Sequence, residues 1–424
     1  MSILESLGER FAALDPAAFS AADRAALDTH VLDTAAALLT GAATPDGSAA
    51  IAFTARGLGG ALDAVAAQVA ATRSTEVDDI HLPSGTTPGA IVVPTALGLA
   101  GHLGVTDLKV TYGAIAAGYE AMTRLGAAIR GQAIGYQGVW ATYFCAPFAT
   151  AAVTARLLGL DALTTAHALA IALPMAAGRA GPTSGGKTAR WLLAGDAARM
   201  GCKAAFAAAE GYRGETALLD GRWLDAAHGI DARTGEMLAG LDTGSVLARV
   251  SIKPYCSAKQ VLGAICALEE ILGRGVDPKA IDSVRVIVPG DFVRMIDHGV
   301  EANNRLSSLT SAPYQLALAA FHRDGLFDVA RETVHRSDDI VAFMAKVSIQ
   351  GDEELDEHLP DHWPAALDVS VGGRSETTLV LDAPGDPSRP YSFDDVGKKF
   401  HALADRLVGA DKVDAWIKNL DLSQ

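Results

Sequence analysis

Residues 181–195 read GPTSGGKTARWLLAG, and two different folds could contain them. The spacing of the glycines, Lys187 and the threonine after it matches a phosphate-binding loop, in which backbone amides and the lysine hold nucleotide phosphates. A loop of that kind follows a buried strand and opens a helix. In the alternative, the stretch is a glycine-rich loop that brings Lys187 and Arg190 to the mouth of a helical bundle.

The residues in front of this stretch favour the helical bundle. Residues 161–178 read DALTTAHALAIALPMAAG, an alanine-rich segment that opens on Asp161. Aspartate is a preferred residue for capping the start of a helix, and alanine has the highest helix propensity. The segment is therefore predicted to be a helix rather than a strand, which makes a P-loop nucleotidase the minor alternative.

The composition indicates a mainly α protein that does not bind polyanions. A chain of 424 residues is long enough for two or three domains, and we expect two. Half of the residues are hydrophobic, with alanine the most frequent, and only 6 % are aromatic, so helices packed through small side chains are favoured. The net charge of −15 argues against nucleic acid or an anionic membrane as a partner. A small anionic substrate would need a local cationic pocket.

Cysteine spacing and the apolar tracts indicate a cytoplasmic protein. The amino terminus carries acidic residues where a signal peptide would be basic, and Arg156, Asp161 and His167 interrupt the longest apolar tracts, so no membrane span is expected. The cysteines have no paired short spacing, which predicts neither a disulfide framework nor a zinc site: Cys145, Cys202, Cys256 and Cys266.

The later part of the chain changes towards strands. Residues 282–291 alternate between polar and apolar side chains and are rich in β-branched residues, which is typical of a strand. Residues 366–382 are predicted to form a hairpin that turns at Gly372 and Gly373. A helix is predicted to begin near Pro313 between these strands. A last amphipathic helix is expected after a linker at residues 382–390.

Several segments, in this order and spacing, resemble the MmgE/PrpD family, which includes 2-methylcitrate dehydratases, cis-aconitate decarboxylases and an iminodisuccinate epimerase. They are EVDDIHLPSGTTPGA (76–90), residues 146–172, residues 189–214, IKPY (252–255), SAPYQLALAAF (311–321) and GKKFHALADRLVG (397–409). The resemblance implies a large all-helical domain (1–270), a smaller α+β lid domain with an antiparallel sheet (271–391) and C-terminal helices that pack back on the first domain (392–424). It also implies a homodimer with a site between the domains and without metal or organic cofactor.

Catalytic sites of the family look to be built from two histidines, two lysines, a tyrosine and an aspartate. The chain retains Lys253 and Tyr314 at matching positions, and it has Glu76 at an acidic position ahead of the family's Asp pair, Asp78 and Asp79. It departs from the pattern at three other positions. Thr87 and Trp140 stand where the histidines are usual, and Arg190 stands where a lysine is usual.

These departures set the candidate residues. Neither threonine nor tryptophan can exchange protons as imidazole does at neutral pH, so the base has to be another group. The candidate catalytic residues are Lys253, Tyr314, His81, Tyr143 and Lys187. The candidate substrate-binding residues are Arg190, Glu76, Asp79, Thr87 and Trp140.

The resemblance and these residues lead to one expected function and two alternatives. The chain is expected to be a cofactor-independent enzyme that abstracts the proton α to a carboxylate of a small di- or tricarboxylate-like substrate. The enolate-like dianion formed in this way needs fixed cations, for which Arg190 and Lys253 are suited. A lyase (dehydratase or decarboxylase) is preferred, an epimerase or isomerase is the first alternative, and a non-catalytic carboxylate binder is the second.

Overall fold

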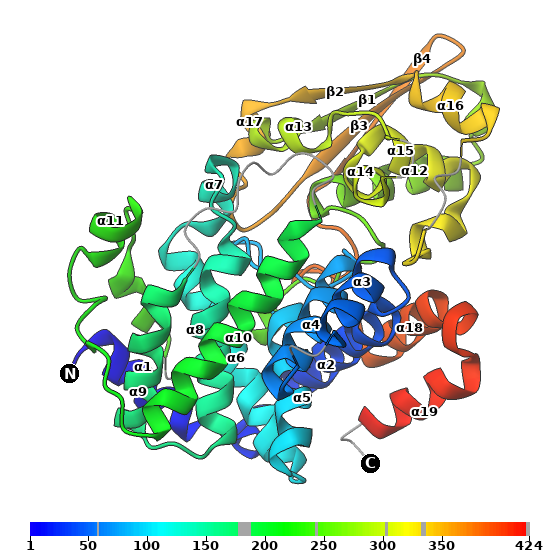
Figure 1. Cartoon of the computed structure of the whole chain (residues 1–424). Helices are drawn as coiled ribbons and strands as arrows, with labels where there is room; N and C mark the ends of the chain where they lie inside the picture. Colours follow the sequence, from blue (N-terminus) through cyan, green and yellow to red (C-terminus); the bar gives the residue numbers. More distant parts are fainter. Residues whose placement is uncertain (57–58, 177–187, 242–244, 302–303, 332–335, 421–424) are drawn as a thin grey trace.

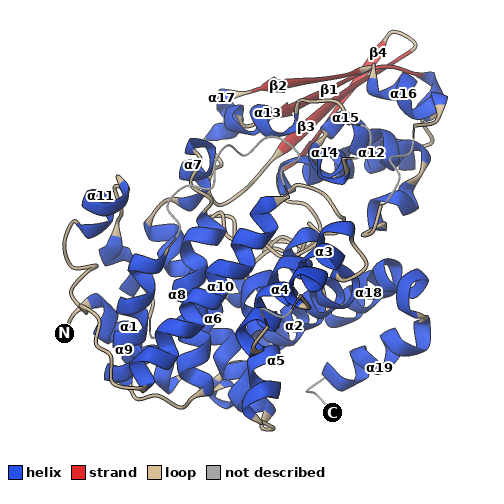
Figure 2. Cartoon of the chain, viewed as in Figure 1, coloured by secondary structure: helices blue, strands red, loops and turns tan. Residues whose placement is uncertain are grey.

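The fold is mainly α, with one small sheet at the top of the view in Figure 1 and the helices below it (Figure 2). The computed structural model describes residues 1–56, 59–176, 188–241, 245–301, 304–331 and 336–420. The part before the sheet holds α1 (Ile3–Ala13), α2 (Ala21–Gly41), α3 (Pro45–Thr54), α4 (Ala61–Ser74), α5 (Gly89–Leu103), α6 (Leu108–Ala128), α7 (Gly131–Ile134), α8 (Ala141–Leu157), α9 (Ala162–Ala172), α10 (Ala189–Ala209) and α11 (Trp223–His228). We call this part the helical region.

The sheet and its helices follow in the chain, and we call them the sheet region. It comprises α12 (Lys259–Gly273), β1 (Ile281–Val288), α13 (Gly290–Ile296), α14 (Arg305–Thr310), α15 (Ala312–Phe321), α16 (Asp338–Met344), β2 (Val347–Gly351), α17 (Glu353–Asp356), β3 (Ala365–Val371) and β4 (Arg374–Val380). Two further helices, α18 (Phe393–Val408) and α19 (Ala410–Leu420), come after it and return to the side of the helical region (Figure 1).

Small residues let the long helices of the helical region approach closely. Helix α10 packs on α4 and α8, and two of its glycines lie at the points of contact. A Cβ atom on Gly195 would collide with the carbonyl oxygen of Ala66, and one on Gly201 would collide with that of Pro147. This packing agrees with the alanine-rich composition, which favoured helices joined through small side chains.

The residues around the glycine-rich stretch are helical, as predicted. Asp161 caps α9 by accepting a hydrogen bond from the backbone N–H of Thr164 at 2.7 Å, and α10 begins at Ala189. In the described part of the chain, strands of the sheet occur only between residues 281 and 380. The buried strand that a phosphate-binding loop needs in front of it is therefore replaced by α9, while Lys187 itself lies outside the described residues.

The sheet is mixed, which corrects the predicted antiparallel sheet. Its strand order is β2-β1-β3-β4, and β1 pairs with β2 in parallel, with Val284 opposite Val347. The expected hairpin is present, because β3 and β4 are antiparallel and turn at Gly372 and Gly373, which have positive φ angles of 56° and 79°. A parallel pair requires a long crossover. Here helices α13 to α16 supply that crossover, so local patterns could not indicate the direction of β2.

The hydrophobic residues form separate clusters in the two regions. One cluster fills the helical region, and a second joins the sheet to α12, which packs on β3 and β4. Ile80 and Leu82, from the loop after α4, also belong to the second cluster. The second core therefore includes a helix that begins before residue 271, and it reaches back to a loop of the helical region.

Helix α18 packs against α2, near the chain segment that follows α4. Its Lys399 ammonium donates to the Asp33 carboxylate on α2 and, at 3.1 Å, to the backbone carbonyl oxygen of Val77. All three residues are buried. The last amphipathic helix thus packs on α2 of the helical region.

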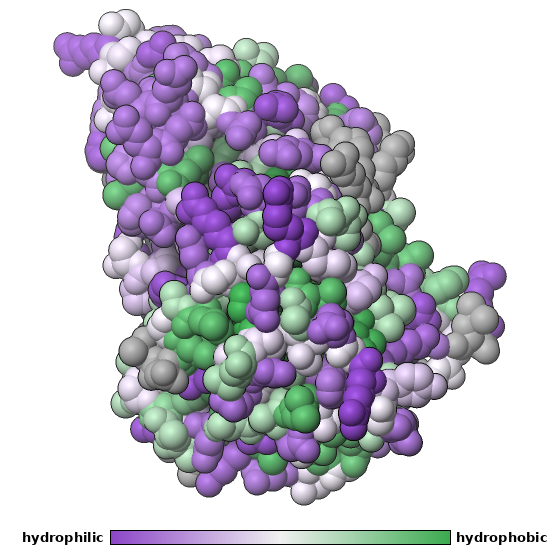
Figure 3. Space-filling view, turned by 90° about the vertical axis from the view of Figure 1, so that its left-hand side faces the viewer, coloured by the Kyte–Doolittle hydropathy of each residue, from purple (hydrophilic) through white to green (hydrophobic). Residues whose placement is uncertain are grey.

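The outer surface mixes polar and apolar residues. Figure 3 shows one face, on which hydrophilic residues cover much of the upper and middle part and apolar residues form scattered patches. In the part of the chain that the structure describes, no helix combines the length and hydrophobicity that crossing a membrane requires.

Candidate functional site

The loop between α4 and α5 is held rigidly by Asp79. Its Oδ2 accepts a hydrogen bond from the Tyr119 hydroxyl at 2.6 Å and lies 3.0 Å from His30 Nδ1, while Oδ1 accepts from the backbone N–H of Gly89 at 2.8 Å. Asp79 is fully buried. Both of its oxygens are occupied by the protein, so Asp79 fixes the loop and does not line the pocket where it was expected to bind substrate.

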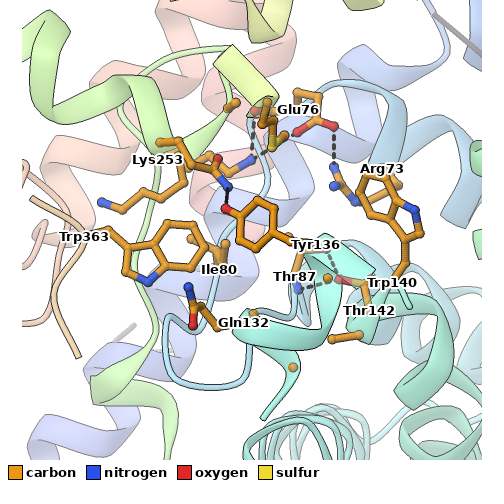
Figure 4. Close-up of a pocket in the computed structure, with 18 of the residues that line it drawn as sticks. Arg73, Glu76, Ile80, Thr87, Gln132, Tyr136, Trp140, Thr142, Lys253 and Trp363 are labelled. Atoms are coloured by element: carbon orange, nitrogen blue, oxygen red, sulfur yellow. Dashed lines mark hydrogen bonds and ion pairs between the residues drawn. The ribbon is translucent and has the colours of Figure 1, made fainter. Parts of the chain in front are cut away.

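A pocket opens where this loop meets both regions of the molecule (Figure 4). The cavity volume is about 90 Å³, which leaves room for a small molecule. The helical region and its loops supply Arg73, Glu76, Ile80, Gly85, Thr87, Gly131, Gln132, Gly135, Tyr136, Trp140, Ala141, Thr142 and Arg190. Lys253 lies in the segment between the two regions, and so does Ala258, directly before α12. The sheet region supplies Lys259, Gln260, Met295 and Trp363.

Three cations converge on the carboxylate of Glu76. Arg190 Nη2 donates to Glu76 Oε1 at 2.5 Å, and Arg73 Nη1 lies 3.2 Å from the same oxygen. Lys253 Nζ lies 3.4 Å from Oε2. Asp78 joins the cluster through Oδ1, which is 3.2 Å from Arg73 Nη1 and 3.5 Å from Lys253 Nζ. All five side chains are buried, so three positive groups face two negative ones away from water.

Burial and charge shift the two carboxyl groups in opposite directions. Burial alone would raise the pKa of Glu76, but the charges of Arg73, Lys253 and Arg190 outweigh it and hold that pKa well below its ordinary value. Burial raises the pKa of Asp78 above its ordinary value, although Arg73 and Lys253 oppose the shift. Glu76 is therefore a firm anion, whereas Asp78 accepts a proton more readily than an ordinary aspartate.

Glu76 also has an unusual backbone. Its φ angle is +58°, in the left-handed region that residues with a side chain seldom occupy. Lys253 Nζ donates to the carbonyl oxygen of Glu76 at 3.1 Å and so holds the backbone as well as the side chain. Strained backbone of this kind gathers at functional sites, because the surrounding structure has to enforce it.

Aromatic rings orient the Arg190 guanidinium. Its central carbon lies 4.0 Å from the ring centroid of Trp191 and 4.9 Å from that of Trp140. Trp140 in turn stacks on Tyr143, with ring centroids 5.7 Å apart. Trp140, which the resemblance aligned with a histidine, positions a cation here. Thr87, at the other such position, donates its backbone N–H to Thr142 Oγ1 at 3.1 Å on the pocket wall.

Of the ten predicted site residues, the pocket wall brings five together: Glu76, Thr87, Trp140, Arg190 and Lys253. Tyr143 lies behind Trp140, where burial raises the pKa of its phenol. Tyr314 is buried in the second hydrophobic cluster, with Arg331 5.9 Å from its ring centroid, and is not part of the wall. Its catalytic role stays a prediction.

His81 faces a different cavity. That cavity lies beside Arg124 and Arg249, and the Nδ1 atom of His81 is 2.9 Å from Ser84 Oγ. Burial, with a smaller effect of Arg249, lowers the pKa of His81 to about 3. An imidazole in this place is separated from the cation cluster, so the structure gives no support to His81 as the base of this pocket.

Sequence reasoning missed several residues of the wall, among them Arg73, Gln132, Gln260 and Trp363. The one available signal was the position of Arg73, which lies three residues before Glu76 and pairs with it. The other three come together only through contacts between distant segments. In the described residues, no group of three or more His, Cys, Asp and Glu side chains is arranged to hold a metal ion.

Residues 3–228 match the MmgE/PrpD N-terminal domain, and residues 255–422 match the MmgE/PrpD C-terminal domain. The chain belongs to the MmgE/PrpD family. The comparison with curated proteins gives no match. Membership of the MmgE/PrpD family points to dehydratase-like or related catalysis. The two matched domains lie on either side of the pocket, and Lys253 falls in the segment between them.

Proposed function

We propose that this MmgE/PrpD protein is a cofactor-independent enzyme that removes the proton α to a carboxylate of a small di- or tricarboxylate-like substrate. We further propose that it is a lyase. The observation that carries the proposal is the convergence of Arg73, Arg190 and Lys253 on one buried carboxylate in the wall of a pocket. In a chain of net charge −15, such a cluster attracts a small anion that the rest of the molecule repels.

The cations suit the charge that develops in this reaction. Removing a proton next to a carboxylate places a second negative charge on the substrate oxygens, and fixed buried cations stabilise that charge. Arg190 would bind the substrate carboxylate edge-on, because Trp140 and Trp191 cover the faces of its guanidinium. Glu76, with its low pKa, is a poor base and sets the spacing of the cations.

Lys253 and Asp78 would transfer the proton. Lys253 Nζ is 3.5 Å from Asp78 Oδ1, and burial, which raises the pKa of Asp78, favours this carboxylate as the group that takes up the ammonium proton when the substrate binds. The neutral amine would then take the α-proton, which regenerates the ammonium and leaves the enolate beside it. In a lyase, the enolate expels a hydroxyl group from the neighbouring carbon, and this group takes the proton held by Asp78 and leaves as water. In an epimerase, it regains a proton on the other face.

Solvent exchange tests this proposal. Malate, citrate and related di- and tricarboxylates, each incubated with the enzyme in heavy water, are followed by proton NMR. At least one is expected to lose its α-proton signal, and Lys253→Met should slow this loss about 100-fold or more, as for other general bases. Lys279→Met, which changes an exposed lysine, is the control and should exchange at the wild-type rate.

The same spectra separate the alternatives. New olefinic signals indicate a lyase, whereas exchange with inversion and no new product indicates an epimerase or isomerase. A carboxylate that stabilises the protein against heat but never exchanges indicates a non-catalytic binder. Exchange that persists unchanged in Lys253→Met would rule out the proposed base.

A further inference from the structure

The indole of Trp363 presents an unused hydrogen-bond donor at the pocket. Trp363 lies in the loop between α17 and β3, is only 7 % exposed and lines the pocket wall. Its Nε1 makes no hydrogen bond to any part of the chain that the structure describes. Buried donors in native proteins nearly always have a partner, because an unpaired one loses the hydrogen bond it made to water.

Neighbouring rings hold this donor in place. The Trp363 ring packs on Phe292 with centroids 5.1 Å apart, and Phe292 lies 6.3 Å from the ring of Tyr136. The Tyr136 hydroxyl accepts a hydrogen bond at 3.0 Å from Gln260 Nε2, which joins the two regions across the pocket. In Figure 4 the indole of Trp363 and the amide of Gln132 lie together, on the opposite side of Tyr136 from Trp140 and Arg73.

The side chains around Trp363 carry almost no net charge. Gln132 and Gln260 carry uncharged amides. Tyr136 carries a phenol that stays neutral, because burial raises its pKa. Lys259 also lines this part of the pocket and is a cation. Its ammonium donates to both oxygens of the Asp386 carboxylate, at 2.5 and 2.7 Å, which compensates its charge. The pocket therefore has a cationic end at Glu76 and an uncharged, hydrogen-bonding end at Trp363.

We propose that Trp363 Nε1 is a specificity determinant that donates a hydrogen bond to an uncharged oxygen, a hydroxyl or carbonyl, of the bound substrate. The proposal rests on the proposed function, since it takes a carboxylate of the same molecule to be held by Arg190 and Lys253. An indole N–H donates a hydrogen bond but does not ionise near neutral pH. Trp363 therefore orients and selects the substrate without serving as acid or base.

Matched pairs of carboxylates test this inference. Malate and succinate differ by one hydroxyl, as do citrate and propane-1,2,3-tricarboxylate, and 3-hydroxybutyrate and butyrate. Calorimetric titration measures the affinity of each for the wild type, for Trp363→Phe, which keeps an aromatic ring and removes the N–H, and for Trp223→Phe. Trp223 lies on α11, outside the pocket, and controls for the substitution itself.

In the wild type and in Trp223→Phe, the hydroxylated member of at least one pair should bind about threefold to tenfold more tightly, which is the range of one neutral hydrogen bond. In Trp363→Phe this preference should disappear, while the affinity for the other member stays within about twofold. A preference for the hydroxyl that survives in Trp363→Phe overturns the inference and leaves the proposed function standing.

The remaining outcomes separate the two proposals. If no pair shows a preference for the hydroxyl in the wild type, the inference about Trp363 is wrong, although carboxylate binding and exchange can still occur. If none of the six carboxylates binds, and none loses its α-proton in heavy water, the cationic end is not a carboxylate site and both proposals fall. Loss of all binding in Trp363→Phe with an unchanged thermal midpoint would assign Trp363 to the carboxylate end instead.

Discussion

Lys253 Nζ lies 3.1 Å from the backbone carbonyl oxygen of Glu76 and 3.4 Å from its carboxylate, although 177 residues separate the two in the chain. One ammonium therefore holds both the left-handed backbone and the side chain of the same residue. The pocket depends on this contact, because Glu76 in turn sets the positions of Arg73 and Arg190.

The first prediction concerns the charge of Glu76. Glu76→Gln should lower the free energy of unfolding at pH 7 by about 3–5 kcal/mol, because three buried cations lose an anion that compensates them. Urea denaturation measures this loss, and Glu357→Gln, at an exposed position, is the control. A bound dicarboxylate should restore part of the stability of the variant, since it supplies the missing negative charge.

This effect depends on pH in a definite direction. The pKa of Glu76 lies below its ordinary value of 4.5 in the folded protein, so its stabilising effect is complete above about pH 4.5 and is lost as the pH falls further. The difference in stability between wild type and Glu76→Gln should therefore narrow in acid. An equal difference at pH 7 and at about pH 3.5 would contradict the proposed charge state.

The second prediction separates charge from shape at Arg190. Arg190→Ala should weaken carboxylate binding by roughly 2–5 kcal/mol, because it removes one member of a buried charge pair. Arg190→Lys keeps the charge but not the planar group that lies against Trp140 and Trp191, so it should recover only part of the loss. Calorimetric titration compares the variants, and wild-type affinity in Arg190→Lys would show that stacking has no role.

The third prediction assigns Asp79 to stability. Asp79→Ala should lower the free energy of unfolding by about 3 kcal/mol or more, because it leaves the donors of His30, Tyr119 and Gly89 unpaired in the interior. Tyr119→Phe removes one of these donors and should cost less. If Asp79→Ala instead unfolds at the wild-type temperature and loses only substrate affinity, Asp79 binds substrate as the sequence suggested.

The fourth prediction concerns His81. Its pKa of about 3 lies below the ordinary value of 6.5, so the unfolded chain binds a proton at this residue more readily than the folded protein does. Stability should therefore fall as the pH drops from about 6.5 towards 3, by at most about 1.4 kcal/mol for each pH unit. His81→Gln should flatten the dependence of the unfolding free energy on pH in this range, as measured by denaturation at a series of pH values. An unchanged slope would show that another group takes up the proton on unfolding.

Local signals predicted the parts of the fold that depend on neighbouring residues. Asp161 caps α9 because its side chain accepts a hydrogen bond from the backbone N–H of the residue three positions further along. A pair of glycines between two alternating segments likewise indicates a hairpin. The parallel pairing of β2 was missed because five residues carry little pattern and their direction is set by a crossover of some sixty residues.

The same distinction applies to the pocket. Glu76, Arg190 and Lys253 could be found because each lies in a segment that resembles the family, which supplies the long-range information. Trp363 and Gln132 lie outside those segments, and only the folded chain brings them together. The homodimer, the cytoplasmic location and the domain boundaries remain predictions.

The contact between Lys399 and Val77 has a consequence for synthesis on the ribosome. Lys399 follows Val77 by 322 residues, a delay on the order of tens of seconds at usual elongation rates. Until α18 emerges, the Asp33 carboxylate has no ammonium beside it. The carbonyl oxygen of Val77, next to Glu76, also lacks its hydrogen bond from Lys399. A nascent chain stopped before α18 would thus contain every pocket residue and still have an unfinished site, so activity should appear only after translation has passed this helix.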